Sequence, residues 1–106
     1  MENLETLINM YLEYCEYHKN LDKKTLKAYS IDLQQFKNYM SIKELDFSVK
    51  ASLNQYITKI HKLYKPKTIK RKIASVKAFY HYLQYEEILD INPFDKIDIK
   101  FREPQR

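Results

Sequence analysis

The residues best suited to chemistry in this chain are cations on one predicted helix. These cations recur at spacings of three and four residues, as Lys67, Lys70, Arg71 and Lys77, and Ala74 and His81 lie on the same stripe. This spacing places them along one side of the helix. Lysine and arginine neutralise phosphates, arginine can also bind both acceptors of a guanine edge, and the small Ala74 would let the helix approach a groove closely. The pattern therefore indicates an interface for nucleic acid.

A second group of candidate residues opens another predicted helix, nearer the N-terminus. Lys24, Thr25, Lys27 and Ala28 follow Asp22, which has the side chain and the position of an N-cap. The first turn of a helix presents backbone N–H groups and the positive end of the helix dipole, and both favour phosphate. Thr25 can support the cap, donate to a phosphate, or do both. We expect these four residues after the cap to extend the interface.

The distribution of charge also indicates a polyanionic partner. The chain has 106 residues and a net charge of +5, yet no Asp or Glu occurs from Phe47 to Tyr85. That segment carries +9, so the rest of the chain carries −4. A basic segment on an otherwise acidic chain is typical of proteins that bind a polyanion. The alternative is that these lysines form only an ordinary solvated face.

The residue constellations of common enzymes are absent from the sequence. His18, His61 and His81 are scattered, and none has a cysteine or an acid at the spacing of a metal site. The single cysteine, Cys15, lies on an apolar stripe and is predicted to be a core residue and not a nucleophile. A P-loop, a G-x-S-x-G motif and an H-E-x-x-H motif are all missing. We therefore predict no catalytic residue, no metal and no cofactor for this chain.

Composition predicts a small cytoplasmic protein. The length is that of one domain, and the 44% of hydrophobic residues suffices for a core. One cysteine cannot form an internal disulfide, and the apolar runs are too short to cross a membrane. The acidic, polar start is unlike a signal peptide. We expect a reduced protein of the cytoplasm with no membrane association.

Two helices are predicted in the first half of the chain, because apolar residues recur there at helical spacing. The first should run from about Leu4 to His18, and the second from the Asp22 cap to about Ser41. Their apolar stripes comprise Leu4, Leu7, Ile8, Tyr11, Leu12, Cys15 and His18 in the first helix, and Leu26, Tyr29, Leu33, Phe36 and Met40 in the second.

Two more helices are predicted in the second half. Ser48 is the expected cap of the third, and Pro66 suits the first turn of the fourth, where its missing N–H costs nothing. The fourth should end around residues 85–87, with Tyr82 and Tyr85 exposed. The expected buried residues are Leu53, Tyr56, Ile57, Ile60 and Leu63 in the third helix, and Ile69, Ile73, Val76, Tyr80 and Leu83 in the fourth.

Together these elements predict an all-α, four-helix bundle over residues 1–94. The absence of glycine argues against tight hairpins, and no window convincingly predicts a strand. Asn92-Pro93 is a turn signal at the end of the bundle. Residues 95–106 are polar and are predicted to begin a linker, in which Ile97, Ile99 and Phe101 alternate weakly.

Three segments resemble the N-terminal half of tyrosine recombinases of the phage-integrase family. Residues 21–36 are similar to the pattern S-x-x-T-x-x-x-Y-x-x-D-L-x-x-F, and residues 68–83 to the helix T-I-x-R-x-L-S-A-L-R-x-F-Y-x-Y-L. Ile91-Asn92-Pro93-Phe94 matches the N-P that closes the domain. The segments occur in order and at matching spacing, and they cover nearly the whole chain. The departures are Asp22 and Lys65 where serine is usual, and Lys77 in place of arginine, which keeps the charge but loses the bidentate fork.

The resemblance implies a SAM-like core-binding domain that clamps one face of a crossover-site duplex. In the family the second and fourth helices approach the major groove. Carried over by position, this implies DNA contacts from Lys24, Thr25, Ala28, Lys67, Lys70, Arg71, Ala74 and Lys77. The closeness of Met1 to the first helix favours a Xer-like or simple integrase layout.

The resemblance also implies what this chain alone would not do. The catalytic Arg, Lys, His, Arg and nucleophilic Tyr of the family lie in a C-terminal domain that would begin about where this sequence ends. We therefore expect no cleavage activity from the chain alone. The full protein would bind double-stranded DNA as a tetramer, and cleave and rejoin it through a phosphotyrosine intermediate made by its C-terminal catalytic domain.

Two other interpretations stay open. The chain could be a stand-alone DNA-binding regulator, or a remnant that no longer recombines DNA. It could also be a protein-interaction module whose basic face meets an acidic partner. Preference for duplex DNA over an equally charged polyanion would separate the DNA-binding interpretations from the last one.

Overall fold

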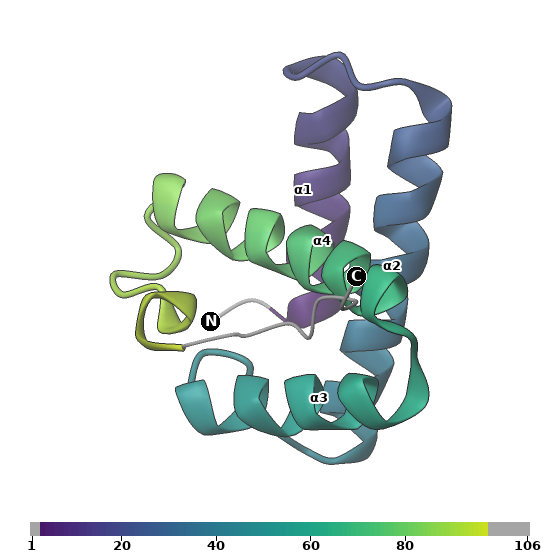
Figure 1. Ribbon diagram of the computed structural model, residues 1–106. Helices are drawn as coiled ribbons and strands as arrows, with labels where there is room; N and C mark the ends of the chain where they lie inside the picture. The colour runs from purple at the N-terminus through teal and green to yellow at the C-terminus, as the bar shows by residue number, and fades with distance from the viewer. Residues whose placement is uncertain (1–2, 98–106) are drawn as a thin grey trace. The chain divides into compact units, whose positions relative to one another are not determined.

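A computed structural model of the chain describes residues 3–97, and these residues are all-helical with no strand (Figure 1). The predicted all-α class is thus confirmed. The elements are α1 (Leu4–Tyr17), α2 (Lys23–Ile42), α3 (Lys50–Leu63), α4 (Pro66–Tyr85) and a short 3-10 helix, η1 (Pro93–Lys96). They divide between two compact units, Met1–Leu45 and Asp46–Arg106. Within the described part of the chain, no helix is both long and apolar enough to span a bilayer.

The first unit is a pair of helices, α1 and α2, which lie side by side and run antiparallel (Figure 1). The helical stripes predicted from the sequence supply the buried apolar residues, which are Leu7, Ile8, Tyr11 and Cys15 on α1 and Leu33, Phe36 and Met40 on α2. Asp32, outside the predicted stripe of α2, is buried as well. The rings of Tyr11 and Tyr29 stack at 6.3 Å across the two helices. Cys15 is buried, as predicted, and burial raises the pKa of its thiol.

The second unit is organised around Tyr80 on α4. Its ring makes edge-to-face contacts with the rings of Phe47, Phe79 and Phe94 at 5.2–6.4 Å between centroids. Its hydroxyl donates a hydrogen bond to the carbonyl oxygen of Phe47. Because Phe47 precedes α3 and Phe94 lies in η1, this one side chain joins α4 to both of those segments.

Local capping accounts for several helix boundaries. Asp22 caps α2 as predicted, because its carboxylate accepts the backbone N–H of Thr25 at 2.9 Å. Pro66 occupies the first turn of α4, also as predicted. Asn92 caps η1 through the N–H of Phe94 at 3.0 Å.

Ser48 does not cap the third helix, so that prediction was wrong. The N-cap of α3 is Val49, which has no capping side chain. The hydroxyl and the backbone N–H of Ser48 both bond to the carboxylate of Asp46, at 2.6 and 2.9 Å. Ser48 therefore forms a local turn with Asp46, two residues earlier, in place of a helix cap. Serine and aspartate side chains favour such turns as well as caps.

The connections use residues other than glycine in the left-handed region. Asn20, Glu44 and Glu87 have φ of 54°, 53° and 61°. Glu44 and Glu87 follow the ends of α2 and α4, where the N–H of the next residue reaches back to a carbonyl of the last turn (Leu45 to Met40, and Ile88 to Leu83, each 2.9 Å). This is the geometry of a Schellman cap, in which glycine is the usual residue.

Two burial predictions were also wrong. Leu63, expected in the core, is 59% exposed at the last position of α3. Tyr82, expected to be exposed, is only 6% exposed on α4. Tyr85 is exposed, as predicted. The predicted linker from residue 95 overlaps η1, and its residues 98–106, with Ile99 and Phe101, lie outside the described residues.

Candidate nucleic-acid interface

The candidate residues of α4 form one continuous exposed stripe. Lys67, Lys70, Arg71, Ala74 and Lys77 are all exposed, and His81 continues the stripe. At 3.6 residues per turn these positions occupy an arc of about 120°. A separate arc of about 180° carries the buried residues, from Ile69 to Leu83. The helix therefore packs on one side and presents a cationic surface on the other. We call this surface the α4 stripe.

The start of α4 has no acid that would neutralise the stripe. Its N-cap, Lys65, makes no side-chain capping bond, and its first turn contains no Asp or Glu. This agrees with the departure noted in the sequence, where lysine replaces the usual capping serine. The positive end of the helix dipole therefore adds to the charge of Lys67.

One lysine of the basic segment is not on the surface. Lys72 is only 2% exposed, and its Nζ lies 4.8 Å from the centre of the Tyr64 ring. It belongs to the packed side of α4, three residues after Ile69 and four before Val76. The burial of Lys72 could therefore have been predicted from its helical spacing in the sequence. The local charge of +9 thus overstates the charge that a partner can contact.

The candidate residues of α2 lie together in its first two turns. Lys24 and Lys27 are exposed, while Thr25 and Ala28 are half-buried. The hydroxyl and the N–H of Thr25 bond to the Asp22 carboxylate, and these bonds lower the pKa of Asp22 below its ordinary value. Thr25 thus supports the cap, and an anion at this helix start would meet a carboxylate already in place.

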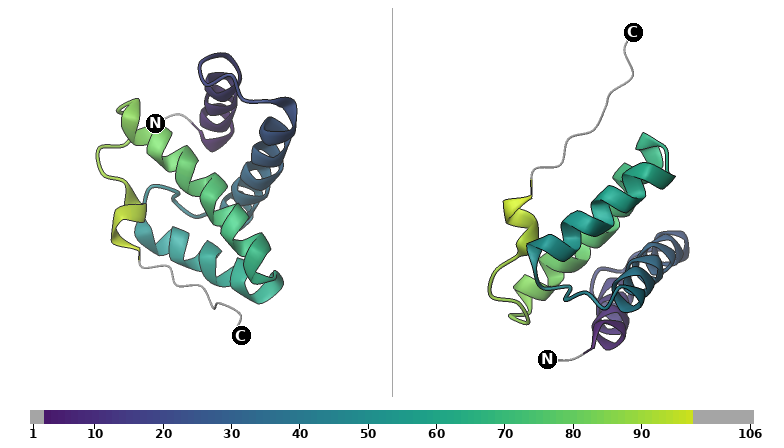
Figure 2. Two further views of the ribbon diagram at one scale, coloured as in Figure 1. Left: turned by 45° about the horizontal axis from the view of Figure 1, so that its top comes forward. Right: turned by 90° about the horizontal axis from the view of Figure 1, so that it is seen from below.

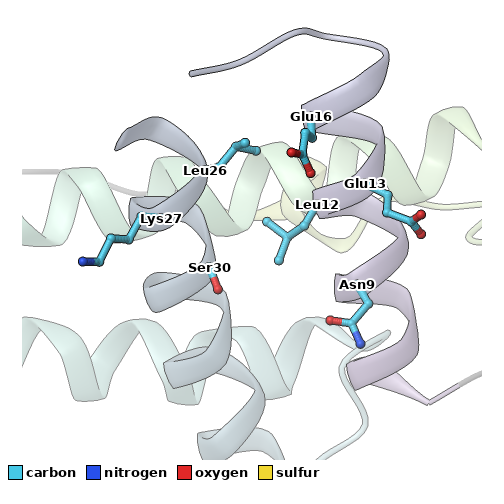
Figure 3. Close-up of a pocket in the computed structure, with 7 residues that line it drawn as sticks. All are labelled: Asn9, Leu12, Glu13, Glu16, Leu26, Lys27 and Ser30. Carbon is cyan, nitrogen blue, oxygen red and sulfur yellow. The ribbon is translucent and has the colours of Figure 1, made fainter. Parts of the chain in front are cut away.

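A shallow groove of about 490 Å³ runs between α1 and α2 beside this helix start (Figure 3). It is lined by Asn9, Leu12, Glu13, Glu16, Leu26, Lys27 and Ser30. Figure 3 shows Lys27 pointing to the outer side of α2, away from Glu13 and Glu16 on α1. Its ammonium group is therefore directed to solvent and not into the acidic side of the groove.

The two groups of candidate residues belong to different units of the chain. Within each unit the candidate residues lie together, the α2 residues in the first unit and the α4 stripe in the second. A single interface made by both surfaces stays a prediction.

Other kinds of site are not assembled in the described part of the chain. His18, His61 and His81 are all exposed, and the Nδ1 of His61 bonds to the carbonyl oxygen of Ile57 at 2.9 Å. No cluster of three or more potential metal ligands occurs among residues 3–97. The buried thiol of Cys15, with its raised pKa, is poorly placed to act as a nucleophile.

The residues of the two long motifs mostly pack inside the protein. In the first motif Asp32, Leu33 and Phe36 are buried. In the second, the aromatic pair Phe79 and Tyr80 is buried. The motifs therefore describe mainly how the helices pack, and the two basic positions of the second motif, Arg71 and Lys77, are exposed.

This fold and its motifs define a class of protein. Residues 8–87 match the family model described as the phage integrase N-terminal SAM-like domain. The chain belongs to the phage-integrase family of tyrosine recombinases. It comprises the N-terminal domain, as predicted, and not the part in which the resemblance places the catalytic residues.

Individual relatives carry the corresponding names. The chain is 56% identical to a tyrosine recombinase of Agathobacter rectalis, over 98% of this chain and 34% of that protein. It is 31% identical to tyrosine recombinase XerC of Anoxybacillus flavithermus, over 89% and 33%. A putative tyrosine recombinase of Caldanaerobacter subterraneus is 34% identical, over 84% and 32%. The chain therefore spans about a third of the length of these relatives. No solved structure matches the chain.

Proposed function

We propose that this domain binds duplex DNA at the crossover site of a site-specific tyrosine recombinase. The observation that carries the proposal is the α4 stripe: Lys67, Lys70, Arg71 and Lys77 are exposed on one arc of a helix whose other side is packed. A cationic helix face without acids is typical of protein surfaces that bind the phosphate backbone of nucleic acids.

In this proposal α4 lies in the major groove. The stripe from Lys67 to His81 extends about 21 Å along the helix, at 1.5 Å per residue, and the groove of B-DNA is about 12 Å wide. The lysines would neutralise phosphates, while Arg71 can bind the O6 and N7 of a guanine. Ala74 lies in the middle of the arc, where a small side chain permits close approach to the bases.

The start of α2 would contribute a second set of phosphate contacts. Lys24 and Lys27 are exposed, whereas the Thr25 N–H and hydroxyl are bonded to Asp22. We therefore assign the phosphate contacts to the two lysine side chains and not to the amides of the first turn.

For the complete protein we propose the reaction implied by its family. The N-terminal domain would clamp one face of the duplex, and the catalytic domain, outside this chain, would cleave and rejoin the strands through a phosphotyrosine as part of a tetramer on DNA. The relatives named XerC favour a Xer-like layout. Because two linked domains share the duplex, the isolated N-terminal domain should bind weakly.

The test is a salt titration of binding to duplex DNA, with heparin as a competing polyanion. Wild type is compared with Lys70→Glu/Arg71→Glu and with Lys19→Glu/Lys43→Glu. The second variant makes the same change of charge at exposed residues outside both candidate groups. We expect the first variant to lose binding and the second to retain most of it. Equal losses, or heparin competing as well as DNA, would reject the α4 stripe and favour an acidic protein partner.

A further inference from the structure

We infer that the corner between α3 and α4 is a second phosphate-binding patch, formed by Lys59, Lys62 and Lys65. We call it the corner patch. The inference rests on the proposed function, because it assumes that α4 meets DNA. It adds a surface that neither the motifs nor the α4 stripe includes.

The three lysines lie close together in the chain and are all exposed. Lys59 and Lys62 are on the last turns of α3, which ends at Leu63, and Lys65 is in the two-residue connection before Pro66. Figure 1 and Figure 2 show α3 and α4 meeting at this corner. The segment from Phe47 to Tyr85, which carries all three lysines, contains no Asp or Glu.

The corner is held in place by several contacts. The N–H of Tyr64 donates to the carbonyl oxygen of Ile60 at 3.0 Å, and the N–H of Ile69 donates to that of Lys65 at 3.0 Å. The ring of Tyr64 lies against the buried ammonium group of Lys72, and Pro66 restricts the backbone. The backbone positions of the lysines are therefore set relative to α4, so binding has to order only their side chains.

Its place at the start of α4 determines what the patch can contact. The α4 stripe begins at Lys67, two residues after Lys65. The stripe is about 21 Å long, whereas the major groove is about 12 Å wide. A helix of this length that enters the groove at an angle would bring its first residues over one sugar-phosphate strand. Lysine is suited to that contact, as a flexible point charge without the geometry to read a base edge. The corner patch would thus add affinity without adding sequence preference.

The test compares Lys59→Gln/Lys62→Gln/Lys65→Gln with Lys19→Gln/Lys43→Gln/Lys96→Gln. Both variants remove three charges from exposed positions, and only the first touches the patch. Binding of the 106-residue chain is measured against salt on a duplex selected from a random pool and on a scrambled duplex, with circular dichroism as the check of folding. We expect the first variant to lose at least about 10-fold in affinity at low salt, equally on both duplexes, and its log–log salt slope to fall by about 2 to 3.

The outcomes separate this inference from the proposed function. If the corner variant binds like its control while Lys70→Glu/Arg71→Glu loses binding, the inference is overturned and the proposed function stands. A loss confined to the selected duplex would also overturn it, because the patch would then read bases. If wild type does not prefer duplex DNA to heparin, both fail.

Discussion

The hydroxyl of Tyr80, on α4, donates a hydrogen bond to the backbone carbonyl oxygen of Phe47, which lies 33 residues earlier and before α3. Both residues are buried, and burial raises the pKa of the Tyr80 hydroxyl well above its ordinary value. The bond ties the helix with the α4 stripe to the turn that begins its own unit.

Tyr80→Phe tests the contribution of this bond. The substitution keeps the ring contacts and leaves the Phe47 carbonyl buried without its donor, which should lower the free energy of unfolding by about 1–3 kcal/mol. Urea unfolding measures the effect. Tyr85→Phe, at a position 69% exposed, is the control and should change nothing measurable. Equal stability of the two variants would contradict the role assigned to the bond.

Two lysines on α4, separated by one residue, should respond very differently to charge reversal. Lys72 is buried against Tyr64, so Lys72→Glu places a carboxylate in the packed side and should cost about 3 kcal/mol or more. Lys70 is exposed, so Lys70→Glu should change stability by less than about 0.5 kcal/mol. Thermal unfolding of the two proteins, which have the same net charge, measures the difference. Similar midpoints would mean that Lys72 does not face the interior.

The turn before α3 should lose stability in acid. The hydroxyl and N–H of Ser48 bond to the Asp46 carboxylate and lower the pKa of Asp46 below its ordinary value of 3.8. A lowered pKa means that this stabilisation is complete above the unfolded value and is lost as the pH falls through the folded one.

Asp46→Asn should therefore be less stable than wild type at pH 6, and the gap should close below about pH 4. Urea midpoints measured between pH 6 and pH 2.5 give the comparison. A gap that is constant over this range would show that the carboxylate charge does not contribute.

The single arginine of the α4 stripe should affect sequence preference more than affinity in general. Arg71→Lys keeps the charge but loses the bidentate fork, so the preference for a selected duplex over a scrambled one should fall by roughly 10- to 100-fold. The salt slope should stay the same. Lys70→Arg is the control, because it replaces the neighbouring lysine with arginine. It should not reduce the preference for the selected duplex. An unchanged preference in Arg71→Lys would assign Arg71 to phosphate.

Asp22 should weaken the interaction of α2 with DNA. Its carboxylate caps the helix beside Lys24 and Lys27, at the position where the family pattern that the sequence resembles has a neutral serine. Asp22→Asn keeps a capping side chain and removes the charge, so DNA affinity at low salt should rise while the thermal midpoint stays close to that of wild type. Asp90→Asn, at another exposed acid, serves as the control. A rise of the same size in both variants would reflect net charge alone.

Much of this protein follows from local rules that can be read in the sequence. Asp22 and Pro66 mark the starts of α2 and α4, because a cap and a first-turn proline act on the residues immediately beside them. The spacing of Lys67, Lys70 and Lys77 predicts an exposed stripe on α4, because helical geometry alone sets the relative directions of those side chains.

Tertiary structure decided how wide each buried surface is. The predicted stripe of α4 covers an arc of about 80°, but the buried arc is about 180° and extends as far as Tyr82. Periodicity locates the centre of a buried face, whereas its width depends on how many neighbours pack against it, and α4 meets both Phe47 and Phe94. Leu63 illustrates the opposite case, since α3 ends there and its side chain is left exposed. Burial at the edges of a helix face is set by residues distant in the sequence, and no local pattern contains that information.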